Sequence, residues 1–167
     1  MEFTSRVGEI NKMEWKEQGV NLYPDIILSD CTVSEIRINN TEMVLKFSDY
    51  GFIKKDRNNK YYRTDGAQVV IEGCDIESVS IKEIRTQQLC EEIYFDSMYD
   101  IETKTLFENV NMGKWRLEIV EEFYSTGGGI YIGQIRNEED VFWFYIKMRY
   151  KKLIYLWNNV RYDFPVN

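Results

Sequence analysis

The sequence contains no histidine among its 167 residues. Histidine is the most frequent general base in enzymes, it activates serine and cysteine nucleophiles, and it is a common zinc ligand. Its absence therefore excludes Ser–His and Cys–His catalytic pairs and most zinc and iron sites. An enzyme built from this chain would have to work with carboxylates, lysine, tyrosine or an unassisted cysteine.

Long apolar runs and prolines are also scarce. The longest wholly apolar run is Val141–Ile146, which is too short to cross a membrane as a helix. The first residues alternate in charge and lack the basic-then-apolar layout of a signal peptide. The only prolines are Pro24 and Pro165, so no proline-rich linker divides the chain. We expect no membrane contact and no interdomain linker.

Cysteines are few and unpatterned. The three in the chain are widely spaced and form no CxxC motif: Cys31, Cys74 and Cys90. An odd number of isolated thiols is typical of a protein kept in a reducing compartment. The sequence therefore predicts a cytoplasmic protein with idle thiols, and it offers no motif for a metal or another cofactor.

Negative charge is concentrated in the middle of the chain. Residues 65–140 carry 17 acidic and 6 basic side chains, whereas the remaining residues carry 11 acidic and 15 basic ones, for a net charge of −7. Nucleic-acid binding needs lysine and arginine at the phosphates, so the acidic middle argues against it. This region suits a cationic partner, and a solvated acidic surface is the simpler alternative.

Aromatic residues gather toward the end of the chain. Lys114–Trp157 holds 11 of the 25 aromatic residues, and tyrosine and phenylalanine favour half-buried strands. Residues 115–123, 130–135 and 141–150 read as strands, with a glycine-rich turn at 127–129. Residues 153–157 read as a further strand, reached through a tight turn or a bulge at 151–152.

Short apolar runs separated by turn residues occupy most of the remaining chain. In residues 87–112 a strand is followed by either a short helix or a long loop. We predict a mainly β, single domain over residues 1–167, with residues 1–22 as a poorly patterned N-terminal segment. The expected architecture is an antiparallel sandwich or a curled, barrel-like sheet of about nine to eleven strands, with at most one or two short helices.

Glu121 is the carboxylate with the most unusual expected position. Strict alternation places it on the same face as Leu117 and Phe123, and it places Glu122 on the opposite, solvated face. A glutamate that points into the core has a raised pKa, as a general acid does. The alternative is a position at the rim of the sheet or an ion pair with a cation.

A second group of carboxylates surrounds Tyr99 in the ambiguous section. Asp96, Asp100 and Glu102 are close enough in sequence to act together in acid–base chemistry or to hold Ca²⁺. The spacing matches no EF-hand and lacks its glycine, so a solvated loop is the simpler interpretation and no metal site is predicted.

The aromatic run at 141–150 offers a candidate contact surface. One face of this strand is expected to be core, while Trp143 and Tyr145 stay partly open on the other. This face continues to Lys147 and Arg149, and aromatic residues beside a cation are frequent anchors of protein contacts. The same residues would serve as ordinary core if both faces were covered.

The chain carries two short motifs that resemble a known group. One is Leu-x-Asp-Cys-x-Val-x-x-Ile at residues 28–36, and the other pairs Gly113-x-Trp115 with the strand Glu121–Tyr124. With these motifs the chain resembles small β-rich bacterial proteins, some of which are immunity proteins of toxin systems. The resemblance covers about residues 28–157, and it implies no catalytic residue.

These observations favour a non-enzymatic protein-binding domain, in the form of an immunity protein that neutralises a toxin through an acidic surface. The alternative is a carboxylate-based enzyme or a small-ligand-binding β domain that uses Glu121 or the Asp96–Glu102 group. A third hypothesis is a homo-oligomer formed through the aromatic face of the sheet.

Overall fold

The computed structural model describes residues 15–48, 50–89 and 92–167, and the side chains of residues 86–89 and 92–96 lie outside this description. Within the described residues the chain forms fourteen strands, one α-helix and the short 3-10 helix η2 (Ile76–Ser78). The expected mainly β, antiparallel architecture with few helices is confirmed. The expected segment 1–22 lies mostly outside the described residues, although Glu17–Val20 form a strand.

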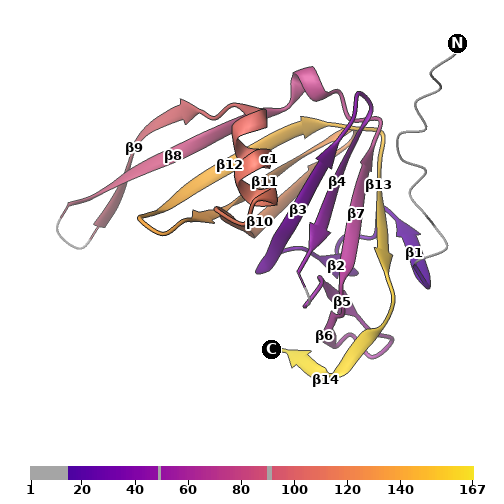
Figure 1. Ribbon diagram of the computed structural model, residues 1–167. Coiled ribbons are helices and arrows are strands. Elements are labelled where there is room, and N and C mark those ends of the chain that lie inside the picture. Colours follow the sequence, from indigo (N-terminus) through magenta and orange to yellow (C-terminus); the bar gives the residue numbers. More distant parts are fainter. Residues whose placement is uncertain (1–14, 49, 90–91) are drawn as a thin grey trace, which may run out of the picture.

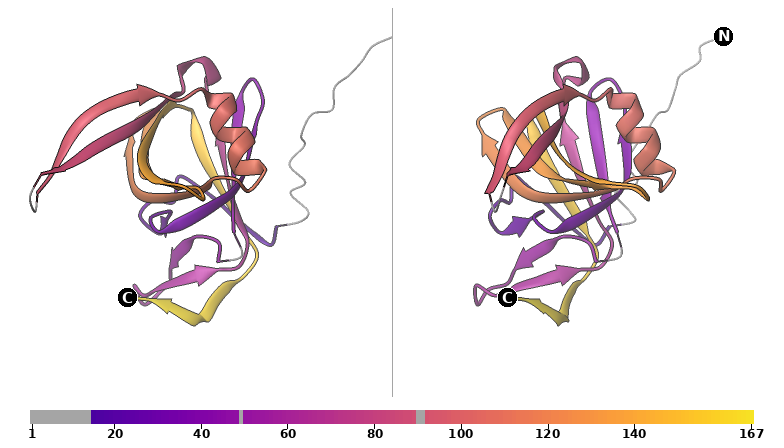
Figure 2. Two further views of the ribbon diagram at one scale, coloured as in Figure 1. Left: turned by 60° about the vertical axis from the view of Figure 1, so that its left-hand side comes forward. Right: turned by 90° about the vertical axis from the view of Figure 1, so that its left-hand side faces the viewer.

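Ten strands form one antiparallel sheet (Figure 1). Their spatial order is β1 (Glu17–Val20), β13 (Lys152–Trp157), β7 (Ala67–Glu72), β4 (Glu42–Phe47), β3 (Cys31–Ile38), β10 (Arg116–Ser125), β11 (Gly128–Arg136), β12 (Val141–Arg149), β8 (Ser80–Leu89) and β9 (Glu92–Asp100). The end strands β1 and β9 do not pair with each other, so the sheet curls without closing into a barrel (Figure 2).

Four short strands form a second antiparallel sheet below the first in Figure 1. Their order is β14 (Val160–Val166), β6 (Tyr61–Thr64), β5 (Ile53–Lys55) and β2 (Ile26–Ile27). The chain passes between the two sheets several times, because β2 leads into β3, β4 into β5, β6 into β7, and β13 into β14.

The expected meander over residues 115–150 is present as β10, β11 and β12, which pair in sequence order. The glycine-rich segment is a hairpin turn, and Gly127 takes a φ of 79° that a side chain would strain. The expected continuation into 153–157 by a hairpin or a bulge is wrong. β13 crosses to the other half of the sheet, where it pairs with β7 and β1 and not with β12.

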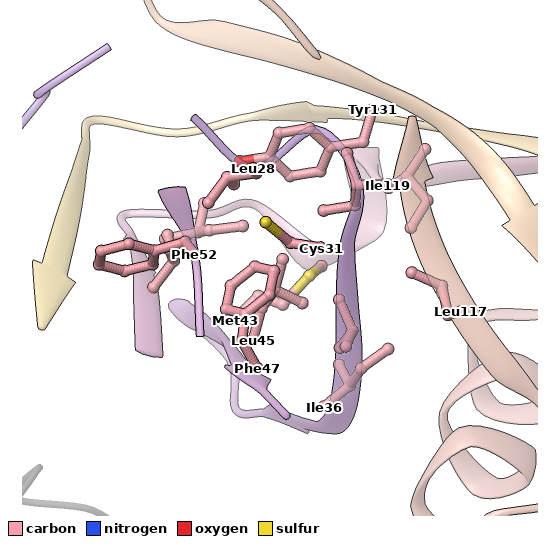
Figure 3. Close-up of a cluster of buried hydrophobic side chains, with 14 of the residues drawn as sticks. Leu28, Cys31, Ile36, Met43, Leu45, Phe47, Phe52, Leu117, Ile119 and Tyr131 are labelled. Carbon is pink, nitrogen blue, oxygen red and sulfur yellow. The ribbon is translucent and has the colours of Figure 1, made fainter. Parts of the chain in front are cut away.

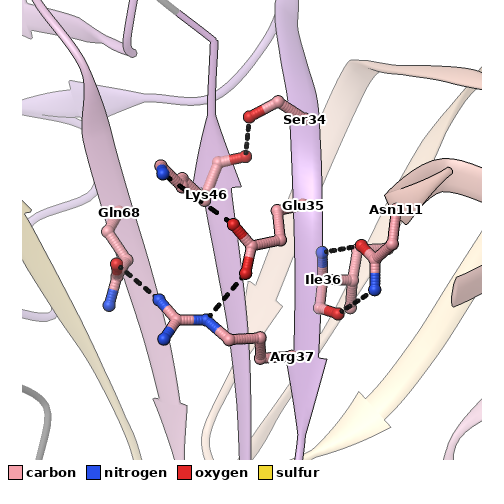
Figure 4. Close-up of polar contacts among 7 residues, drawn as sticks. All are labelled: Ser34, Glu35, Ile36, Arg37, Lys46, Gln68 and Asn111. Carbon is pink, nitrogen blue, oxygen red and sulfur yellow. Dashed lines mark hydrogen bonds and ion pairs between the residues drawn. The ribbon is translucent and has the colours of Figure 1, made fainter. Parts of the chain in front are cut away.

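The helix α1 (Thr103–Asn111) fills a gap between β3 and β10. These strands pair only from Cys31 to Val33 of β3. Further along β3, the Ile36 N–H donates to Asn111 Oδ1 over 2.7 Å, and Asn111 Nδ2 donates to the Ile36 carbonyl over 2.8 Å (Figure 4). Asn111 therefore satisfies backbone groups that a neighbouring strand would otherwise pair with.

Both sheets contribute to one cluster of buried hydrophobic side chains (Figure 3). Phe52, which precedes β5 of the second sheet, packs edge-on against Phe47, Tyr155 and Trp157 of the first. Helix α1 adds Leu106, Phe107 and Val110 to the same cluster. The first sheet thus has an inner face that covers this core and an outer face on the opposite side.

Candidate functional site

The side chains of β12 alternate between the core and the outer surface of the sheet. Phe144, Ile146 and Met148 are at most 3% exposed and belong to the core cluster. Because side chains alternate along a strand, the residues between them point to the outer face. The four residues proposed for binding therefore lie together: Trp143, Tyr145, Lys147 and Arg149, with the aromatic pair half-buried and the cations exposed.

Neighbouring strands extend this surface with further apolar side chains. Trp143 lies opposite Ile84 of β8, and Tyr145 lies opposite Ile132 of β11. Ile130 continues the row toward β10, where Phe123 is its direct partner and is 51% exposed. We call this set the outer patch: Ile84, Phe123, Ile130, Ile132, Trp143 and Tyr145.

Charged residues of both signs border the outer patch. Lys147 and Arg149 stand at one end, and no carboxylate of the described residues lies within ion-pair distance of either. Glu118 and Glu121 lie along β10, opposite Gln134 and Ile132 of β11. An apolar centre with a charged rim is the usual anatomy of a protein-binding surface.

Glu121 does not share a face with the core. The pairing of β10 with β11 shifts between Ile119 and Glu121, which makes Val120 the extra residue of a β-bulge. After the bulge the alternation is reversed, so Glu121 is exposed and Phe123 turns outward, while Glu122 turns inward. The expected inward position of Glu121 is thus wrong, and Glu121 lies on the rim of the outer patch.

Glu122 is the buried carboxylate of this strand and is 7% exposed. The Leu28 N–H donates to its Oε2 over 2.5 Å. Burial raises the pKa of Glu122 to about 7, although the N–H groups of Leu28 and Ser29 and the Tyr124 hydroxyl act in the opposite direction. With so little exposure its role is structural: it ties the segment after β2 to the first sheet.

Tyrosine hydroxyls lie near Glu122 on the inner face of the first sheet. Tyr124 and Tyr131 hydroxyl oxygens are 3.4 Å apart, and burial raises the pKa of both phenols well above the usual value. Burial also raises the pKa of Tyr155, whose hydroxyl lies near Tyr124 and Glu122. The tyrosines therefore stay uncharged.

In the second group of carboxylates, the structure describes the side chains of Asp100 and Glu102. Asp100 ends β9 and forms an ion pair with Lys82 over 3.2 Å, and Glu102 is exposed at the start of α1 without capping it. Asp96 lies in β9, but its side chain is outside the described residues. Among the described side chains, no three of the types Asp, Glu, Cys or His gather where a metal could bind.

Two of the cysteines are free and buried, as expected of idle thiols. Burial raises the pKa of Cys31 to about 12, despite the guanidinium of Arg63 beside its Sγ, and burial likewise raises the pKa of Cys74 to about 11. Cys90 lies outside the described residues. In the part of the chain that the structure covers, no helix has the length and apolarity that crossing a bilayer requires.

Sequence reasoning found the β12 half of the outer patch and missed the β10 half. Phe123 was expected to be core, and Glu122 was expected to be solvated. The adjacent apolar pairs Ile119–Val120 and Phe123–Tyr124 around two glutamates were the available signal, because a regular half-buried strand does not place large apolar residues side by side.

Comparison with known proteins adds no further constraint: the chain matches no protein-family model, no curated protein and no solved structure.

Proposed function

We propose that the chain is a protein-binding domain and that the outer patch is its contact surface. One observation carries this proposal: Trp143 and Tyr145 stay partly accessible on a strand whose opposite face buries Phe144, Ile146 and Met148. A contiguous apolar patch on a sheet surface is a typical partner site, and tryptophan and tyrosine are frequent anchors of such contacts.

The charged residues at the rim of the outer patch favour a partner that carries both cationic and anionic groups. Glu118 and Glu121 offer carboxylates along β10, while Lys147 and Arg149 offer exposed cations on β12. Rim charges steer encounter and fix orientation more than they add affinity. We expect association to become slower as salt is raised, because the rim charges are exposed to screening.

Site-specific photo-crosslinking in the native host tests the proposal. Benzoylphenylalanine replaces Tyr145 in one variant and Tyr162 in the matched control, which is 67% exposed on β14 of the second sheet. We expect one discrete protein adduct from position 145 and none from 162. The adduct should vanish when Trp143→Ser is added. Equal adducts from both positions, or none from 145, would overturn the proposal.

The resemblance to immunity proteins adds a more specific form of the proposal, in which the partner is a toxin. Expression of the crosslinked partner alone should then arrest growth, and co-expression of this chain should restore it. The Trp143→Ser variant should not restore growth. A partner that is harmless by itself would remove the toxin from the proposal and leave the contact surface in place.

A further inference from the structure

The outer edge of β9 is open. β9 is the last strand of the ten-stranded sheet, and no strand in the described part of the chain pairs with its outer edge. β9 spans nine residues and projects with β8 beyond the other strands on the left of Figure 1. An unpaired strand of this length presents a row of N–H and C=O groups to any extended chain.

The other sheet edges are shorter or contain a proline. β1 has four residues and β2 has two, so neither supports a long ladder. β14 contains Pro165, which cannot donate to a ladder, and its pairing with β6 is irregular. β9 contains no proline, lysine or arginine, and the one irregularity in its pairing with β8 is a shift at Asp96, between Phe95 and Ser97.

We propose that β9 is a strand-addition site that takes up an extended, basic segment of the partner protein. This inference rests on the proposed protein-binding function and extends the outer patch by one strand. Met98 of β9 lies opposite Ile84 of the patch and is 46% exposed. A segment added to β9 therefore continues the sheet and covers the edge of the patch at the same time.

The acidic residues of β9 favour a basic segment as the added strand. β9 contains Glu92, Asp96 and Asp100 and no basic residue, and the side chain of Asp100 is 83% exposed. Lys82 pairs with Asp100 through Oδ1 over 3.2 Å, and the carboxylate remains largely exposed. Opposite charges on neighbouring strands stabilise a pair, and like charges destabilise it.

Alternation gives the expected pattern of the segment. Asp100 and Met98 share the outer face, while Tyr99 between them points to the other face and is 47% exposed. The segment should therefore carry a cation beside Asp100, any residue next, and an apolar side chain beside Met98.

The same charges argue against a second copy of this chain as the occupant. An antiparallel pair of β9 strands centred on Asp96 would set Glu92 of each copy opposite Asp100 of the other. Every acidic position of the strand would then face another acidic position. Self-pairing in this register is thus disfavoured, and a concentration-dependent dimer that protects the amides of Met98 and Asp100 from exchange would overturn the proposal.

Peptide binding to the full chain tests the proposal directly. The probe is an acetylated ten-residue peptide with the repeat Lys-Thr-Val-Thr, which places lysine and valine alternately on one face, and the readout is amide hydrogen exchange by NMR. We expect exchange at Met98 and Asp100 to slow by at least about tenfold, because their amides point away from β8 and the added strand bonds them. The same peptide with glutamate in place of lysine, and the same peptide N-methylated at alternate backbone nitrogens, should give no protection.

Two charge-reversal variants separate edge binding from general attraction to an acidic protein. Asp100→Lys should weaken peptide binding at least about fivefold, while Glu138→Lys, at an exposed turn position with the same change of net charge, should have little effect. Equal weakening by both, or protection away from β9, would overturn the inference. An adduct from position 145 without peptide protection at β9 would leave the proposed function standing and remove this extension.

Discussion

At the scale of single residues, Glu122 is the most consequential side chain of the structure. It lies in the ten-stranded sheet, yet it binds the backbone of Leu28, which follows β2 of the second sheet. The N–H groups that face it compensate only part of the desolvation, so its carboxyl gains a proton near neutral pH. The link between the two sheets is therefore sensitive to protonation.

Glu122 predicts a stability that falls as pH rises from 4.5 to about 7. The ordinary pKa of 4.5 applies to the unfolded chain, and the raised value applies to the folded chain. Between them the unfolded state releases the proton first and is favoured, which lowers the free energy of unfolding by about 3 kcal/mol at most. Above pH 7 this contribution stays constant.

The Glu122→Gln variant should lose this dependence, because glutamine stays neutral. Urea unfolding from pH 4.5 to 8 gives the free energy of unfolding of both proteins. Relative to the wild type, the variant should gain roughly 3 kcal/mol over that range. Glu121→Gln is the matched control, since Glu121 is exposed next door and should follow the wild type. Parallel curves for wild type and Glu122→Gln would contradict the assignment.

At the scale of elements, the bulge in β10 depends on a glycine in the strand beside it. Gly133 pairs with Ile119, immediately before the bulge. A Cβ on Gly133 would lie 2.0 Å from the Glu118 carbonyl oxygen, which belongs to the backbone and cannot rotate away. Gly133 thus permits the close approach of β10 that accompanies the reversal of its faces.

Gly133→Ala should destabilise the protein by about 2–4 kcal/mol, because strand backbones must separate to admit the methyl group. Gly66→Ala is the control, since a Cβ there meets no atom within 4 Å. Denaturant midpoints at equal m-values provide the measurement. A Gly133→Ala midpoint equal to that of the control would show that β10 and β11 can separate freely.

Regular elements were predictable and irregular ones were not. The β10–β11–β12 meander, its glycine turn and the outer face of β12 followed from alternation. The bulge at Val120 was missed because it leaves the composition of the strand unchanged while it exchanges the two faces. The path of β13 was missed for a different reason: Lys151 and Lys152 read as a local turn or bulge, whereas non-local pairing with β7 and β1 decides the position of β13.

The candidate site divides in the same way. Trp143, Tyr145, Lys147 and Arg149 were identified together because one strand carries all four. The contributions of Ile84 and Phe123 come from strands that meet β12 only in three dimensions, so no local pattern could assign them. Asn111, whose amide substitutes for a strand along β3, carries no sequence signal beyond a polar residue at a helix end.

At the scale of the whole molecule, the two sheets share one core. Phe52 from the second sheet is fully buried against Phe47, Tyr155 and Trp157 of the first. Ile26 and Ile53 of β2 and β5 belong to the same cluster. We therefore expect both sheets to unfold in a single cooperative transition, as a single domain does.

Phe52→Ala should cost about 3–5 kcal/mol and should weaken both sheets together. Native-state hydrogen exchange measures this, and amides of β6 and β7 should lose protection by the same factor. Phe164→Ala, which removes a ring that is 43% exposed and stacked on Tyr50, should change global stability little. Lost protection in the small sheet alone would show that the sheets unfold independently.

The position of β13 also affects how the chain is made. β13 lies between β1 and β7, yet it is the last strand of its sheet to leave the ribosome. Before β13 is synthesised, β1 has no partner strand and one edge of β7 is unpaired. One edge of β8 is likewise unpaired before β12 is synthesised. A nascent chain with open strand edges is prone to aggregate. Its yield in the cell should therefore depend on chaperones that hold such edges apart until synthesis is complete.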